Sequence, residues 1–489
     1  MGSPPMTERW LDLAIIGAYL VAVTIFGARF GKGQKTLRDY FLGGKQAPWW
    51  AISLSIVAAE TSTLTIIGTP ALAFGSDLGF LQIAFGYLLA RVVISLIFIP
   101  AYWRGEMFTA YELMRRRFGE KLRRVTASTF LVTRSLAEGV RVFAISLVVS
   151  VVLGTGELAS IVIISLLTIF YTFHGGMAAV IWTDVVQMAL YVSGALLSFW
   201  MILQQIPGGW EQVAAVALAE DKFRIFHFGF APNMEFFSIT YTFWAGLLGG
   251  CFLTTATHGT DQLVVQRLLS ARSQAESRLA LLSSWFVIFM QFALFLTIGV
   301  MLYVFHQQTG SLPPDPLDRL YPSFVWNYLP PVVSGIVIAA IIAAAMSNIS
   351  AALNSLASAT IVDIALPIFG DRLGNDQAQL RASKIATVAW GAVLIGIAFL
   401  ARTWGSVLEA GLAIASVPLG ALLGVFSLGV LTTRVSQNAA LTGMAAGLAA
   451  VLYTTFRTPV AWTWYVVIGA VVTFSVGLAV SYLFPNRSQ

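Results

Sequence analysis

One apolar stretch of the chain carries hydroxyl and amide side chains that could hold an ion. At helical spacing, one face presents Ala344, Ser347, Asn348 and Ala351, with Ser350 beside them. Sodium is bound by oxygen atoms, and unwound backbone carbonyls opposite such a face would complete an oxygen-lined cavity. Taken alone, small residues on a helix face indicate close packing more often than a site, whereas opposite a broken helix a site is favoured.

Two other apolar stretches, 53–70 and 249–261, contain polar clusters closed by glycine. Unwound backbone survives in a bilayer only where protein or trapped water satisfies its N–H and C=O groups. We therefore expect two discontinuous helices, five apart in order, with the substrate site at the breaks. The alternative is that the small residues only allow close helix packing.

Asp184 lies in a further apolar stretch, roughly a turn and a half inside the predicted cytoplasmic membrane surface. A carboxylate is costly inside a bilayer, so it is a functional candidate by default. The alternative is a hydrogen-bonded structural acid near the interface.

The elements that position these residues are membrane-spanning helices. Of the 489 residues, 57% are hydrophobic and 11% are charged, whereas about 25% are charged in a soluble domain. Apolar stretches of about 20 residues recur along the chain and predict an all-α membrane protein. The thirteen predicted spans are 9–30, 47–75, 79–103, 122–153, 157–174, 178–206, 238–266, 276–306, 331–364, 381–402, 405–432, 435–455 and 461–484.

These spans predict one transmembrane domain over 1–489. The helix at 9–30 is retained rather than cleaved as a signal peptide. Repeat one covers 47–206 and repeat two covers 238–432, and extra helices follow at 435–484.

Lysine and arginine, Arg267 among them, concentrate in the loops that face the cytoplasm if the N-terminus is outside. Arg91, Arg134 and Arg141 remain inside predicted helices. The C-terminus is then cytoplasmic, the connections 207–237 and 307–330 are external, and the cell (plasma) membrane is the expected location. This topology explains the net charge of +6 without a nucleic-acid partner. The single cysteine, Cys251, excludes an internal disulfide, and we expect it to pack within the span 238–266. No Walker A or H-E-x-x-H sequence is present, which argues against an ATP-driven pump and a zinc enzyme.

Five motifs in order give the chain a family resemblance. They are the 53–70 cluster, the segments 109–118, 175–187 and 343–355, and the pair Gln266-Arg267. Over roughly residues 10–430 the chain resembles the sodium/solute symporter family, which includes sodium-coupled carriers of sugars, proline, sialic acid, iodide and vitamins. The resemblance implies the leucine-transporter fold, with inverted five-helix repeats and alternating access. It also implies sodium-coupled symport of a small polar solute.

The resemblance implies a main sodium site. Its ligands would be the carbonyls of Ala58, Thr61 and Ala344 and the side chains of Ser347 and Asn348. The last position is usually serine or threonine in the family, so Asn348 is a departure that puts the ion's geometry and affinity in question.

Some members bind a second sodium ion, which here would use Asp184, Ser347 and Ser350. Those members have a serine where this chain has Ala351. Whether one or two sodium ions move in each cycle stays open.

Similarity to the sialic acid carriers implies that Glu60, Ser62 and Thr65 line the substrate site. The substrate-binding arginine of those carriers falls at Ala137, and the charged residues Arg134, Glu138 and Arg141 flank it on one helix face. They form either a clamp for a carboxylate or an internal Arg–Glu–Arg network, with Glu60 a further candidate member. Sugar carriers place substrate contacts in the stretch that holds Thr254, Thr257, His258 and Asp261.

The solute is expected to be polar and to bear a carboxylate, with a sugar or polyol as the alternative. A proton carried by Glu60 or Asp184 could replace sodium. A membrane-embedded enzyme is disfavoured, because Asp184 is predicted at a different depth from Glu60 and His258. One chain is expected to suffice for transport.

Overall fold

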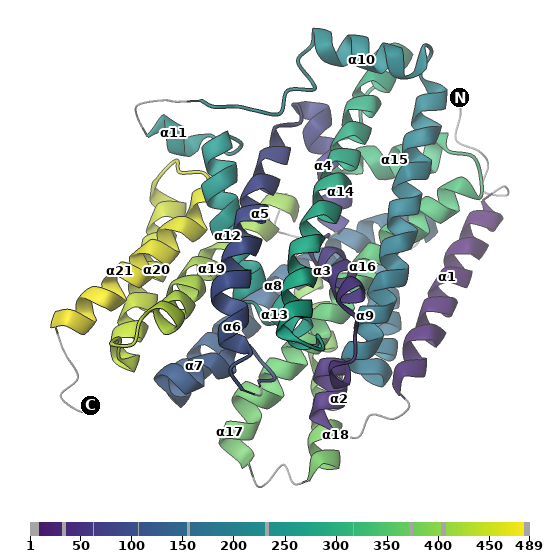
Figure 1. Ribbon diagram of the computed structural model, residues 1–489. Helices are drawn as coiled ribbons and strands as arrows, with labels where there is room; N and C mark the ends of the chain where they lie inside the picture. The colour runs from purple at the N-terminus through teal and green to yellow at the C-terminus, as the bar shows by residue number, and fades with distance from the viewer. Residues whose placement is uncertain are drawn as a thin grey trace.

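The computed structural model describes residues 9–31, 36–61, 63–105, 107–153, 157–229, 234–315, 317–370, 375–401 and 407–483. Every regular element within these ranges is a helix (Figure 1). The expected all-α architecture is therefore confirmed.

Long helices make up most of the molecule because apolar stretches of this length satisfy their backbone internally. They are α1 (Trp10–Ala28), α5 (Gln82–Val93), α8 (Glu120–Leu153), α9 (Glu157–Gln205), α14 (Gln274–Thr309), α16 (Val333–Ser358), α18 (Asp376–Ala401), α19 (Val407–Leu431), α20 (Gln437–Arg457) and α21 (Tyr465–Leu483).

Short helices gather at the two ends of the bundle (Figure 1). At one end lie α10 (Gly209–Ala219), α11 (Glu235–Ser238) and α15 (Leu320–Tyr328). At the other lie α2 (Leu37–Leu42), α7 (Tyr111–Phe118) and α17 (Leu366–Phe369). The two longest connections, 207–237 and 307–330, thus share one end of the bundle.

Tighter and wider helical turns extend several of these elements. The π-helical turns are η5 (Ile94–Phe98), which leads into α6 (Ile99–Tyr102), η6 (Ala245–Gly249) and η8 (Ala359–Ala365). The 3-10 turns are η2 (Arg29–Gly31), η3 (Gly43–Lys45), η4 (Gly79–Leu81), η7 (Leu317–Arg319) and η10 (Trp462–Trp464).

Eight helices in the described ranges are long and apolar enough to cross a bilayer, and a bent pair makes a ninth. The predicted count of thirteen spans is therefore not confirmed. The four remaining predicted spans are helical too, in α8, the first part of α9, the segment after η6, and α19. The helix α9 bends at Gly176, whose φ of 56° and ψ of −151° are not helical. This bend separates the predicted spans 157–174 and 178–206.

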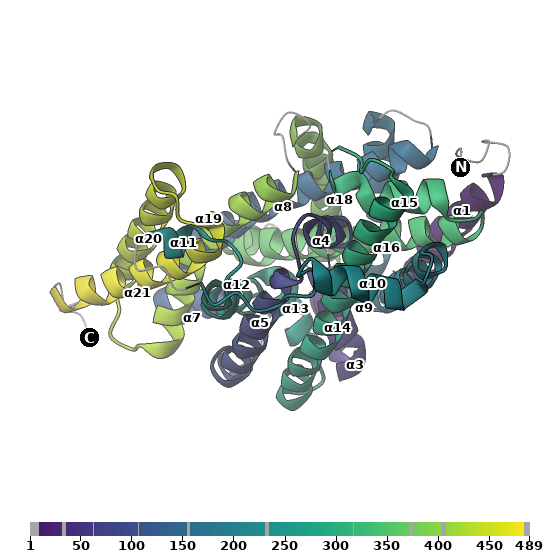
Figure 2. The same ribbon diagram turned by 90° about the horizontal axis from the view of Figure 1, so that it is seen from above.

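The helix α16 lies at the centre of the bundle (Figures 1 and 2). All of its residues except Val333 and Ile336 are buried. In the view from above, α20 and α21 lie at one edge and α1 at the opposite edge (Figure 2). A fully buried helix with a polar face must direct that face at other protein groups, so α16 is placed to carry a site.

Both predicted helix breaks are present. The first separates α3 (Trp49–Glu60) from α4 (Thr63–Gly75), with Thr61 in an extended conformation and the two axes at 59°. The second separates α12 (Gly250–Gly259) from α13 (Gln262–Leu269) at Asp261, which is also extended. Cys251 is buried in α12, as expected.

Candidate solute and ion sites

Three backbone carbonyls converge where the main sodium site was predicted. The amide nitrogen of Asn348 donates to the carbonyl of Thr61 at 2.8 Å, of Ala344 at 2.9 Å and of Ala58 at 3.5 Å. The first break therefore directs its freed carbonyls at α16. The carbonyls suit a cation, because each presents an oxygen lone pair to the same point.

Ser347 faces a different group. Its hydroxyl donates to Asp184 Oδ1 at 2.6 Å, while Asp184 Oδ2 accepts from Arg267 Nη2 at 2.9 Å and from the hydroxyl of Ser55. Arg267 was assigned to an inner loop by the charge pattern, and that assignment is wrong. It is 1% exposed in α13, and its Nε also donates to Ser55 Oγ at 2.7 Å. The intramembrane carboxylate is thus paired with a cation of the protein itself.

The predicted second sodium site is only partly assembled. Asp184 and Ser347 are together, but the hydroxyl of Ser350 donates to the backbone carbonyl of Ser347 at 3.0 Å. The hydroxyl hydrogen of Ser350 is therefore used within α16 and is not donated to the carboxylate of Asp184. Arg267 occupies the neighbourhood of Asp184 that a second cation would need.

A cavity of about 190 Å³ lies between the two broken helices. Its lining includes seven of the predicted substrate residues: Glu60, Thr65, Arg134, Arg141, Thr254, Thr257 and His258. Glu138 and Asp261 contribute through their contacts with the arginines instead. The predicted contact Ser62 lies outside the described residues. Ala137, the position to which the family resemblance assigns a substrate-binding arginine, also lines the cavity.

The charged face of α8 forms a connected network. Arg134 Nη1 donates to Glu138 Oε1 at 3.0 Å, and its Nη2 donates to Asp261 Oδ2. Arg141 donates to Glu138 through Nη1, its one contact recorded within the described ranges. The side chain of Arg141 is 25% exposed, against 11% for Arg134. Arg134 is therefore committed to two carboxylates, whereas Arg141 keeps donor groups available to the cavity.

Glu60 belongs to a separate pair. Its Oε2 accepts from Arg91 Nη2 at 2.5 Å and lies 3.3 Å from His258 Nε2. The other ring nitrogen of His258 is 2.9 Å from the hydroxyl of Thr257. Glu60 was considered as a further member of the network on α8, but its partner is Arg91. The sequence showed Arg91 only as an arginine inside a predicted span. Such an arginine predicts an acidic partner but does not identify which residue it is.

Aromatic residues of the lining were missed by the sequence analysis. They are Phe80, Tyr87, Tyr241, Phe292 and Trp462. Aromatic side chains are common throughout membrane helices, so nothing in the pattern distinguishes those that face a cavity from those that face lipid.

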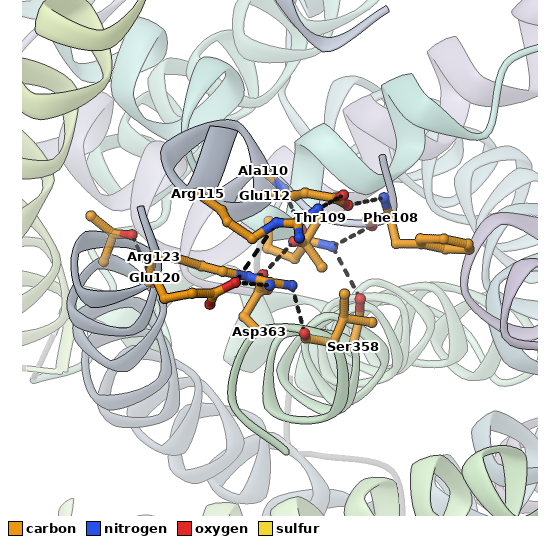
Figure 3. A network of polar contacts seen from close by, with 12 residues as sticks. Phe108, Thr109, Ala110, Glu112, Arg115, Glu120, Arg123, Ser358 and Asp363 are labelled. Atoms are coloured by element: carbon orange, nitrogen blue, oxygen red, sulfur yellow. Dashed lines mark hydrogen bonds and ion pairs between the residues drawn. The ribbon is translucent and has the colours of Figure 1, made fainter. Parts of the chain in front are cut away.

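A polar network connects α13 with neighbouring segments, and Figure 3 shows its members Thr109, Ala110, Arg123, Ser358 and Asp363. Asp363 in η8 accepts from Arg123 Nε at 2.8 Å and from Thr109 Oγ1 at 2.7 Å. Gln262 of α13 accepts from the backbone N–H of Ala110 at 2.8 Å and donates to Ser358 Oγ at 3.2 Å. The second broken helix is therefore tied to the segments that flank α7 and to the end of α16.

Comparison with known proteins agrees with this geometry. Residues 40–447 match the sodium:solute symporter family. The chain is 29% identical to the sodium/sialic acid symporter of Proteus mirabilis, with 98% of this chain and 96% of the relative covered. It is also 29% identical to the mouse sodium-coupled monocarboxylate transporter 1, with 91% and 72% covered.

Solved structures give the same result. A sodium-coupled sialic acid symporter in a substrate-bound outward-open state superposes with a TM-score of 0.87 at 27% identity, covering 98% of this chain and 99% of that one. The nucleobase-cation-symport transporter Mhp1 shares the fold alone, with a TM-score of 0.56 at 13% identity over 93% and 96% of the chains. The expected leucine-transporter fold is confirmed. Since the family match spans most of the sequence, the protein belongs to the sodium:solute symporter family.

Proposed function

We propose that this protein is a sodium-coupled symporter whose solute carries a carboxylate. Sodium coupling and a small polar solute follow from its family. The carboxylate is our addition, and one observation carries it. Arg141 lines the cavity with a single recorded partner in the described ranges, so its remaining N–H groups can form a fork on a carboxylate.

The named relatives support this choice of solute. Sialic acids and monocarboxylates, which those relatives carry by name, are both carboxylic acids. The cavity also offers the hydroxyls of Thr65, Thr254 and Thr257, which could bind solute hydroxyl groups. An acid with hydroxyl groups therefore suits the lining.

A neutral polyhydroxylated solute is the second candidate, and the charge balance of the site favours it. The cations Arg91, Arg134 and Arg141 face three carboxylates, those of Glu60, Glu138 and Asp261. The charges of these six groups cancel, so a neutral solute would leave the balance among them undisturbed. A carboxylate must instead draw Arg141 partly away from Glu138.

The test is uptake by the purified protein in proteoliposomes. We expect an inward sodium gradient to drive accumulation of a sialic acid or of lactate, and the corresponding neutral amide to be transported at least about tenfold less well. Equal uptake of acid and amide, or uptake of mannitol alone, would favour the neutral solute. Uptake driven by an inward proton gradient in choline medium, without sodium, would mean that the coupling ion is a proton.

We further propose an orientation with the N-terminus outside, the C-terminus in the cytoplasm and the protein in the cell membrane. The concentration of lysine and arginine in one set of loops supports this arrangement. The two broken helices support the division into repeats at 47–206 and 238–432. Membership of a transporter family favours transport over an enzymatic reaction.

A further inference from the structure

The amide of Asn348 lies where the coupling cation is expected. Its nitrogen contacts all three carbonyls that the family resemblance assigns to sodium, at 2.8, 2.9 and 3.5 Å. Two of these carbonyls belong to the break after α3, and the third belongs to α16. The amide therefore joins the same two elements that a bound sodium ion would join.

Chemistry fixes which end of the amide faces the carbonyls. The –NH2 group donates two hydrogens, whereas Oδ1 would face acceptor oxygens only. Asn348 is 1% exposed, and Oδ1 is buried without a hydrogen-bond partner in the described part of the chain. The nitrogen is thus fully used, while the oxygen that could bind a cation is idle.

We propose that Asn348 is a tethered substitute for sodium. In the sodium-free protein the –NH2 group holds the carbonyls of the first break. Sodium binds there by displacing that group, and the amide turns over so that Oδ1 becomes a ligand. This inference rests on the proposed function, since it takes these carbonyls as the place where the coupling ion binds.

Two consequences distinguish this chain from a relative with serine or threonine at the position. A hydroxyl has one hydrogen and can hold only one of the carbonyls in the absence of the ion. Sodium in this chain must therefore compete with a bonded group, so it binds more weakly. The sodium-free protein also keeps α3 joined to α16, so it loses less stability when sodium is removed.

The experiment compares the full-length protein with Asn348→Ser. Unfolding temperature in detergent is followed as sodium chloride replaces choline chloride at constant ionic strength. We expect Asn348→Ser to unfold at a lower temperature than the wild type in choline. Sodium should then restore its stability with a half-saturating concentration at least about tenfold below that of the wild type, which corresponds to about 1.4 kcal/mol.

A matched control lies on the same helix. Asn354 is also 1% exposed, but its amide contacts Met177 Sδ at 3.3 Å instead of a carbonyl. Asn354→Ser should leave the half-saturating sodium concentration of the wild type unchanged. If Asn348→Ser does not yield folded protein, Asn348→Thr takes its place.

An equal or higher half-saturating concentration in the Asn348 variant would overturn the proposal, because the –NH2 group would then not compete with sodium for the carbonyls. The absence of any sodium response in both proteins would overturn it as well. Sodium-driven uptake by the wild type separates the two failures. If uptake persists, only the inference is wrong. If uptake ignores sodium, the proposed function fails too.

Discussion

The two broken helices have the same local backbone interruption but opposite surroundings. At the first break the freed carbonyls of Ala58 and Thr61 meet one neutral, rotatable amide from α16. At the second break the Gly259 carbonyl accepts from Tyr102 OH at 2.5 Å, and Asp261 Oδ1 accepts from the N–H of Leu263 at 2.9 Å. Two buried side chains, Tyr102 and Asp261, thus satisfy both ends of the second break.

This difference indicates two roles. Removing a carboxylate that caps a helix and also pairs with Arg134 costs stability, so we expect the second break to stay fixed during transport. An amide that only bridges carbonyls can be exchanged for a cation at moderate cost. The first break is therefore suited to a ligand that comes and goes in each transport cycle.

The largest effect is expected at the second break. Asp261→Asn should lower the free energy of unfolding by about 3 kcal/mol, because Arg134 would keep only Glu138 as a charged partner in a buried site. The unfolding temperature in detergent measures this. Asp77→Asn is the matched control, since Asp77 pairs with His227 at a half-buried position and should matter far less. Similar losses in the two variants would contradict the fixed role of the second break.

The next effect separates the two arginines of α8. Arg141→Lys should raise the half-saturation constant for a carboxylate solute at least about tenfold, because lysine keeps the charge but not the planar fork. Arg134→Lys should lower protein yield or unfolding temperature instead, since Arg134 holds Asp261 and Glu138. Half-saturating sodium measured without solute is the control and should not change in Arg141→Lys. Unaltered solute affinity in both variants would favour a neutral solute.

The sequence was sufficient to predict both breaks and the polar face of α16. Hydroxyl, amide and carboxyl groups are costly in an apolar stretch, so each must find a partner, and helical spacing shows which of them share a face. Spacing also placed Arg134, Glu138 and Arg141 on one helix face, but it left a carboxylate clamp and an internal network equally open.

Contacts between distant segments could not be predicted. Periodicity does not show that Glu60 pairs with Arg91. It shows which residues of one helix share a face, but not which arginine of another helix lies opposite them. The distribution of lysine and arginine placed Arg267 in a cytoplasmic loop. That distribution indicates which loops are cytoplasmic, but it does not show that a buried carboxylate such as Asp184 pairs with one of the arginines. The contact of the Asn348 amide with the carbonyls of Ala58 and Thr61 depends on how α16 packs against the first break, which composition does not show.

A smaller effect concerns the first break. If Ser347 is an ion ligand, as the family resemblance implies, Ser347→Ala should raise half-saturating sodium about fivefold, equivalent to about 1 kcal/mol. The hydroxyl of Ser347 donates to Asp184 in this structure. An unchanged half-saturating sodium concentration would therefore mean that Ser347 binds only that carboxylate and not the ion. Ser355→Ala is the control, because its hydroxyl donates within α16 to the carbonyl of Ala352 at 3.0 Å.

The smallest effect is expected on the Hill coefficient for sodium when the pair of Asp184 and Arg267 is replaced. Asp184 already pairs with Arg267, and a second cation beside that guanidinium would meet a like charge. We therefore expect a Hill coefficient for sodium near one in sodium-driven uptake by the wild type.

Replacing Asp184 alone would leave Arg267 buried without its charged partner, so the informative variant is the double change Asp184→Asn with Arg267→Gln. Its Hill coefficient should also stay near one, with any change confined to the rate. A wild-type coefficient clearly above one that falls to one in the double variant would mean that Asp184 binds a second ion. In that case Arg267 must leave the carboxylate of Asp184 during the cycle. The groups that exchange a protein contact for a sodium ion would then include Asp184 as well as the carbonyls of the first break.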